Sequence, residues 1–126
     1  MEKYFCNYKQ ALALKELGFD MPCIATYTEG AIGNGNDLQW FVSPLEGVNK
    51  DFTFVAAPLK SQVFEWFREK HQLFGVVLCD LCWNISGGVA NDYGDAYDWD
   101  SERYETYEEA ESACIDKLIE LIKQKL

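Results

Sequence analysis

The clearest indication of the fold is the stretch TYEEAESACIDKLIELIK, residues 106–123. Thr106 and Glu109 have the spacing of a capping box, in which two side chains satisfy backbone N–H groups at the start of a helix. Acidic residues crowd the first turns and lysines the later ones, which suits the helix dipole. Apolar residues recur at helical spacing on one face: Ala110, Cys114, Leu118, Leu121 and Ile122. The stretch therefore predicts a long helix that packs by one face on a core.

Two further segments have the pattern of helices. Residues 7–17 begin with Asn7 and Gln10 in capping-box spacing and are followed by Gly18, a residue that commonly ends helices. Residues 58–71 begin with a proline, which the first turn of a helix tolerates. We predict a helix over each segment. Their apolar faces comprise Ala11, Leu14 and Leu17 in the first, and Leu59, Val63, Trp66 and Phe67 in the second.

Five segments are rich in β-branched and aromatic residues and are predicted to be strands. Residues 23–29 and 38–43 flank the turn-forming stretch GAIGNGND and are expected to pair as a hairpin. Residues 51–57 alternate and are interpreted as a third strand, and residues 74–81 and 83–89 supply two more. The whole order, α-β-β-(β)-α-β-β-α, predicts an α+β fold. We expect a mostly antiparallel sheet of four to five strands covered by three helices.

The composition is that of a packed protein. The chain has 126 residues, of which 48% are hydrophobic and 15% aromatic, so burial can offset the entropy lost on folding. No repeat or linker marks a boundary, and we predict a single domain over residues 1–126. The sequence shows neither a signal-peptide pattern nor an apolar run of membrane length, which predicts a cytoplasmic protein. Its five cysteines are then expected to be reduced.

Negative charge is concentrated in one part of the chain. The formal net charge is -10, and residues 91–111 hold nine acidic residues against one arginine, a local sum of -8. Such a field repels phosphate groups, so direct binding to nucleic acids or to anionic membranes is disfavoured. A basic protein is the partner that this field favours.

Aromatic rings interrupt the acidic stretch. A segment that is only solvated has little use for so many rings, so most are expected to pack on the protein itself. We hypothesise that the remainder form a binding face, because tyrosine and tryptophan are favoured at protein interfaces. The residues assigned to this predicted binding face are Tyr97, Asp98, Trp99, Asp100, Glu102, Tyr104 and Glu105.

Motifs for ion and phosphate binding fit the chain poorly. A calcium loop beginning at Asp98 would place Arg103 where glycine is required for the bend, and Glu109 already belongs to the predicted capping box. The glycines of residues 30–35 precede a strand, whereas a phosphate-binding loop precedes a helix. We therefore expect a solvated connector and a hairpin turn at these two places.

The cysteine pair and the histidine do not form a recognised site either. Cys79 and Cys82 are spaced as C-x-x-C, but zinc needs about two further ligands and none accompanies them. In a continuous strand their sulfur atoms would lie on opposite faces, and only an intervening turn would bring them together. His71, the only histidine of the sequence, falls near the end of a predicted helix, where it suits the dipole. We predict no cofactor, no metal site and no catalytic residue.

Three separated blocks of the sequence resemble a known group of proteins. The blocks are ALALKELGFDMPC (11–23), AAPLKSQVFEWFREKHQLFG (56–75) and YETYEEAESACIDKLIELIK (104–123). In this order they are similar to small uncharacterised proteins of bacteriophages and prophages of gut Bacteroidetes, whereas the GNGN turn departs from that pattern. The group has no assigned catalytic or binding residues, so none is carried over. The resemblance implies an intracellular phage or prophage accessory protein, a class that often acts by binding a host protein.

These observations favour a non-enzymatic protein-binding module with a basic partner, acting as a nucleic-acid mimic or as an inhibitor of a host factor. One alternative is a metal- or thiol-dependent enzyme that uses Asp95, Asp98 and Asp100, or the cysteine pair. Another is a self-associating structural protein whose surplus aromatic residues form a homo-oligomer face.

Overall fold

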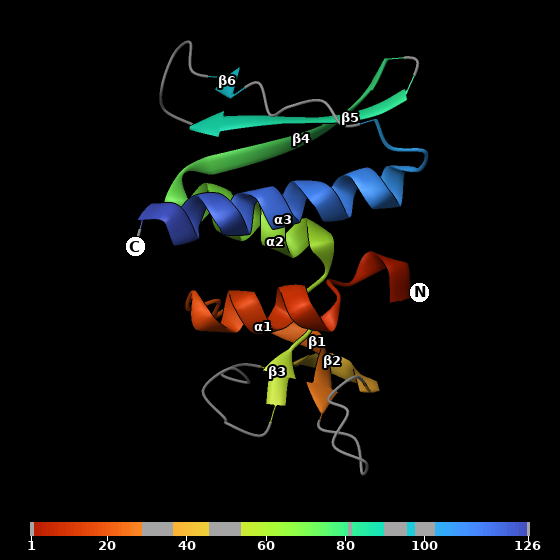
Figure 1. Ribbon diagram of the computed structural model, residues 1–126. Helices are drawn as coiled ribbons and strands as arrows, with labels where there is room; N and C mark the ends of the chain where they lie inside the picture. The colour runs from red at the N-terminus through yellow and green to blue at the C-terminus, as the bar shows by residue number, and fades with distance from the viewer. Residues whose placement is uncertain are drawn as a thin grey trace. The chain divides into compact units, whose positions relative to one another are not determined.

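The computed structural model describes residues 2–28, 37–45, 54–80, 82–89, 96–97 and 103–125. Its contacts divide the chain into two compact units, Met1–Gln62 and Val63–Leu126 (Figure 1), and each unit is described by itself. The single domain expected from the sequence stays a prediction. Both units combine helices with an antiparallel sheet, so the α+β class is confirmed.

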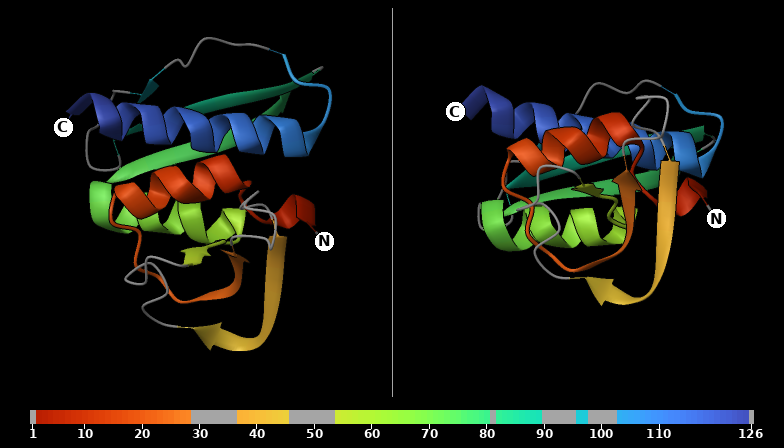
Figure 2. Two further views of the ribbon diagram at one scale, coloured as in Figure 1. Left: turned by 60° about the horizontal axis from the view of Figure 1, so that its bottom comes forward. Right: turned by 90° about the horizontal axis from the view of Figure 1, so that it is seen from below.

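The first unit contains two helical segments and one sheet. Its elements are η1 (Glu2–Tyr4), α1 (Tyr8–Glu16), β1 (Cys23–Thr28), β2 (Asp37–Leu45) and β3 (Phe54–Ala56). The strands are ordered β2-β1-β3 and both pairings are antiparallel, which confirms the predicted hairpin and third strand. The register of β1 against β2 shifts between Cys23 and Ala25, and β2 bends along its length in Figure 2. A bulge of this kind commonly bends a strand.

Helix α1 begins with the predicted capping box. The Asn7 side chain accepts a hydrogen bond from the Gln10 backbone N–H (2.8 Å), and the Gln10 side chain accepts one from the Asn7 N–H (3.1 Å). Ala11 and Leu14 on the predicted stripe are fully buried, whereas Leu12 on the other side is exposed. Both the cap and the amphipathic pattern of this helix are therefore confirmed.

The other end of α1 is closed by backbone hydrogen bonds. The Phe19 N–H donates to the Leu14 carbonyl (2.9 Å) and the Gly18 N–H to the Lys15 carbonyl (3.1 Å), the pattern of a Schellman motif. Gly18 has a φ of 91°, a conformation that glycine adopts without the steric cost of a Cβ atom. Phe19 and Leu14 are both buried, as expected for the two apolar residues at these positions of the motif.

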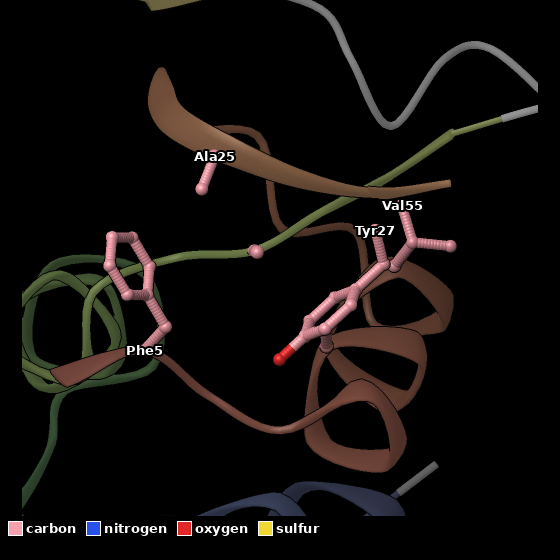
Figure 3. Close-up of a cluster of buried hydrophobic side chains, with 6 residues drawn as sticks. Phe5, Ala25, Tyr27 and Val55 are labelled. Carbon is pink, nitrogen blue, oxygen red and sulfur yellow. The ribbon is translucent and has the colours of Figure 1, made fainter. Parts of the chain in front are cut away.

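The core of the first unit is formed by residues of three segments: the residue that follows η1, helix α1, and the strands with the residue after β3. Phe5, Ala25, Tyr27 and Val55, labelled in Figure 3, form one buried cluster with Ala11 and Ala57. The Tyr27 hydroxyl donates a hydrogen bond to the Cys6 carbonyl (2.5 Å), so this buried polar group is satisfied.

The second unit contains most of α2 and the remaining elements. These are α2 (Lys60–His71), β4 (Leu73–Asp80), β5 (Cys82–Val89), β6 (Ala96–Tyr97) and α3 (Tyr107–Lys125). The strands are ordered β4-β5-β6 and pair antiparallel. On α2, Val63, Trp66 and Phe67 are buried as predicted.

Helix α3 covers one face of the β4–β5 hairpin. The register pairs Gly75 with Gly87 and Val77 with Ile85, so these residues share a face of the sheet. A Cβ atom on Gly75 would lie 2.5 Å from Cys114 Sγ and 3.2 Å from Leu118 Cδ1, which identifies this face as the one against α3. Cys114 and Leu118 are fully buried there, as the predicted apolar stripe required.

Two details of the fold differ from the sequence predictions. The described strands form two three-stranded sheets, where one sheet of four to five strands was expected. Alternation along a segment predicts a strand but does not say which strand pairs with it. Here β1 pairs with β2 and β3, and β5 pairs with β4 and β6, so the two central strands belong to different sheets. The second helix begins at Lys60 and not at Pro58, because the Leu59 N–H is capped by the Gln62 side chain (3.0 Å).

Candidate functional site

Most of the predicted binding face cannot be placed. Tyr97 belongs to β6, where only its backbone is described, and Asp98, Trp99, Asp100 and Glu102 lie outside the described residues. Tyr104 and Glu105 are described, and both lie directly before α3. The candidate site is therefore built from residues 103–111 and from what they contact. The residues of this site, which we name the acidic-aromatic turn, are Trp83, Tyr104, Glu105, Tyr107, Glu108, Glu109 and Glu111.

Backbone pairing attaches the beginning of this turn to the second sheet. The Tyr104 N–H donates to the Trp83 carbonyl (3.0 Å) and the Trp83 N–H donates to the Tyr104 carbonyl (3.3 Å). This isolated antiparallel bridge fixes the chain immediately before α3. The direction in which the first turn of the helix leaves the sheet is therefore defined.

A threonine cap then starts α3. Thr106 Oγ1 accepts a hydrogen bond from the Glu109 N–H (3.1 Å), and the Thr106 carbonyl accepts one from the Ala110 N–H (3.2 Å). The threonine half of the predicted capping box is thus present. Since Thr106 and Glu109 are both exposed, this cap is formed at the surface of the protein.

Tyr107 is the most exposed ring of the acidic-aromatic turn, with 43% of its surface accessible. Its ring meets the ring of Trp83 edge-on, with centroids 5.4 Å apart and an interplanar angle of 79°. Its hydroxyl donates a hydrogen bond to Glu111 Oε2 (3.2 Å). Two contacts therefore hold the ring in one orientation while much of it stays open to solvent.

The electrostatic environment of Tyr107 is negative. Partial burial raises the pKa of its hydroxyl above the ordinary value, and the Glu111 carboxylate raises it further. Residues 103–111 carry four glutamates, of which Glu105 and Glu109 are exposed, and one arginine, Arg103. A cation brought to this surface would meet carboxylates beside an accessible aromatic ring.

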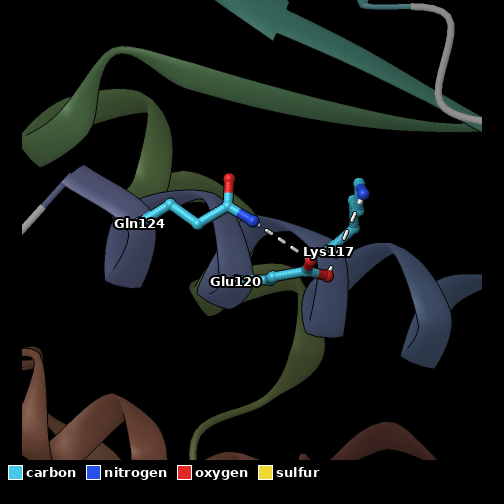
Figure 4. Close-up of polar contacts among 3 residues, drawn as sticks. All are labelled: Lys117, Glu120 and Gln124. Carbon is cyan, nitrogen blue, oxygen red and sulfur yellow. Dashed lines mark hydrogen bonds and ion pairs between the residues drawn. The ribbon is translucent and has the colours of Figure 1, made fainter.

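Further along α3 the charges compensate one another locally. Lys117 Nζ lies 3.9 Å from Glu120 Oε2, and Gln124 Nε2 donates to Glu120 Oε1 (3.3 Å), as Figure 4 shows. Such exposed pairs stabilise a helix only slightly. They do, however, offset part of the negative charge in this part of the helix.

The cysteine pair does not form a site. In the hairpin register Cys79 lies opposite Trp83, and Cys82 lies opposite Asp80. Paired residues share a face of the sheet and adjacent residues do not, so the two cysteines lie on opposite faces. Both thiols are free, and Cys82 Sγ lies 3.7 Å from Asn84 Oδ1. Within the described ranges no three potential metal ligands come together.

The buried cysteines belong to the packed interior, and the half-buried His71 packs against neighbouring aromatic rings. Burial raises the pKa of Cys23 and of Cys114 to about 12, which keeps both thiols protonated and weakly nucleophilic at neutral pH. His71 lies at the end of α2, as predicted, with its ring edge-on to Trp66 at 4.8 Å between centroids. The two thiols are thus enclosed by the protein, whereas His71 keeps part of its surface accessible.

Sequence reasoning missed Trp83 and Tyr107 as members of the site. Trp83 is distant in sequence and reaches the turn only through strand pairing with Tyr104. Tyr107 directly follows the capping residue Thr106. Its spacing of three residues from Tyr104, which places side chains near each other at the start of a helix, is the sequence signal that points to Tyr107.

No described helix is long and apolar enough to cross a membrane. Comparison with known proteins finds no matching family model, no matching curated protein and no matching solved structure.

Proposed function

We propose that this protein is a non-enzymatic binding module whose acidic-aromatic turn contacts a basic protein. The observation that carries the proposal is the exposed Tyr107 ring, held by Trp83 and Glu111 among glutamates. An anchored ring can contribute contact area with little loss of side-chain entropy on binding, because its orientation is already fixed. Tyrosine and tryptophan are also the residues most enriched at the energetic centres of interfaces.

The charge of the turn supports a cationic partner. Glu105, Glu108, Glu109 and Glu111 outnumber Arg103, and the chain as a whole carries a net charge of -10. Opposite charges on a partner would accelerate association at low ionic strength, and salt would screen this effect beyond about 8–10 Å. An arginine or lysine of the partner could lie over the Tyr107 ring and bind the carboxylates beside it.

The same chemistry suits a surface that imitates nucleic acid. Carboxylates at the start of α3 present acceptor oxygens and negative charge, which are the features that a nucleic-acid-binding protein recognises in a phosphate backbone. Together with the resemblance to phage and prophage proteins, this supports an accessory role in which a host factor is bound and inhibited.

The thiol-enzyme alternative has less support. The cysteine pair lies on opposite faces of the hairpin, so the two sulfurs lack the arrangement of a redox couple. The aspartates of the metal-enzyme alternative lie outside the described residues.

A charge-neutralising experiment tests the proposal. Immobilised protein is incubated with bacterial lysate at low salt, retained proteins are identified, and the affinity of each purified basic partner is measured. The variant Glu105→Gln/Glu109→Gln removes two exposed charges four residues apart. The variant Glu65→Gln/Glu69→Gln removes two exposed charges with the same spacing from α2 and is the matched control. We expect the first variant to weaken binding and its salt dependence, and the second to leave both unchanged.

Two results would overturn the proposal. One is that the wild type retains no basic protein at low salt. The other is that the two double variants weaken binding equally, because binding would then depend on total charge and not on the acidic-aromatic turn.

A further inference from the structure

We draw no further inference here: the strongest candidate, the accessible apolar patch of Val76 and Leu78 on strand β4, carries none because nothing in the described part of the chain shows what covers it.

Discussion

Helices α1 and α3 begin with the same type of hydrogen bond but lie in different surroundings. In α1 the cap is followed by a stripe of fully buried residues, and the helix ends in a Schellman motif. In α3 the cap lies at an exposed surface, where Tyr107 and the glutamates around it remain accessible. A local capping signal therefore defines where a helix begins, whereas the surroundings of the helix decide whether its first turn is enclosed by the fold or remains accessible.

The largest effect is expected in the interior of α1. Leu14→Ala removes a side chain with no exposed surface, and we expect it to lower the free energy of unfolding by about 2–5 kcal/mol. Urea unfolding monitored by circular dichroism measures this change. Leu12→Ala on the exposed side of the same helix is the control, with an expected change within about 0.5 kcal/mol. Similar losses for both variants would contradict the placement of the two residues.

The body of α3 is the next most sensitive region. Gly75→Ala would bring a methyl group within 2.5 Å of Cys114 Sγ, so we expect a loss of about 1–3 kcal/mol in unfolding free energy. Cys114→Ala should cost stability in the wild type but relieve part of the loss in Gly75→Ala. Urea unfolding of both single variants and the double variant gives the coupling energy. Simple additivity of the two substitutions would show that the contact is absent.

The sequence predicted the helices better than the sheets. Caps and apolar stripes are local signals, and Asn7, Gly18 and Thr106 mark helix ends where the structure has them. Strand pairing is not local, since alternation cannot say which strand lies beside which. The division into two sheets and the bridge between Trp83 and Tyr104 could therefore not be predicted.

The candidate site was predicted in part for the same reason. Charge concentration singled out residues 91–111 of the sequence. Most of the predicted binding face lies outside the described residues, and Tyr104 and Glu105 alone can be placed with their side chains. The ring that best fits an interface anchor, Tyr107, is defined by its contact with Trp83 from another strand. That contact depends on tertiary structure.

The two caps themselves offer a smaller effect that compares α1 and α3 directly. Asn7→Ala and Thr106→Ala each remove a side chain that accepts a backbone N–H, and each should cost about 1 kcal/mol. We expect the Asn7 variant to cost more, because the capping box of α1 has both of its hydrogen bonds. Thermal or urea unfolding of both variants checks the order. A larger cost for Thr106→Ala would mean that the start of α3 has a structural role like that of α1.

The smallest effect concerns the tyrosine hydroxyl. The pKa of Tyr107 is raised in the folded protein, so the protonated form is favoured by folding. The associated stability is fully present below the unfolded pKa of about 10 and is lost as the pH rises through the folded pKa. As the pH rises above 10, the unfolding free energy of the Tyr107→Phe variant should therefore decrease less than that of the wild type. Parallel pH profiles for the two proteins would contradict the environment described for this hydroxyl.

The most direct test of the acidic-aromatic turn compares two exposed tyrosines. Tyr107 is 43% and Tyr4 is 52% exposed, and both can be replaced by alanine without opening a buried core. The affinity of each variant for the basic protein retained at low salt is measured by titration calorimetry. If the acidic-aromatic turn is the binding surface, Tyr107→Ala lowers the affinity by about 30-fold, or about 2 kcal/mol, and Tyr4→Ala leaves it unchanged. Equal affinities for wild type and Tyr107→Ala would contradict the account.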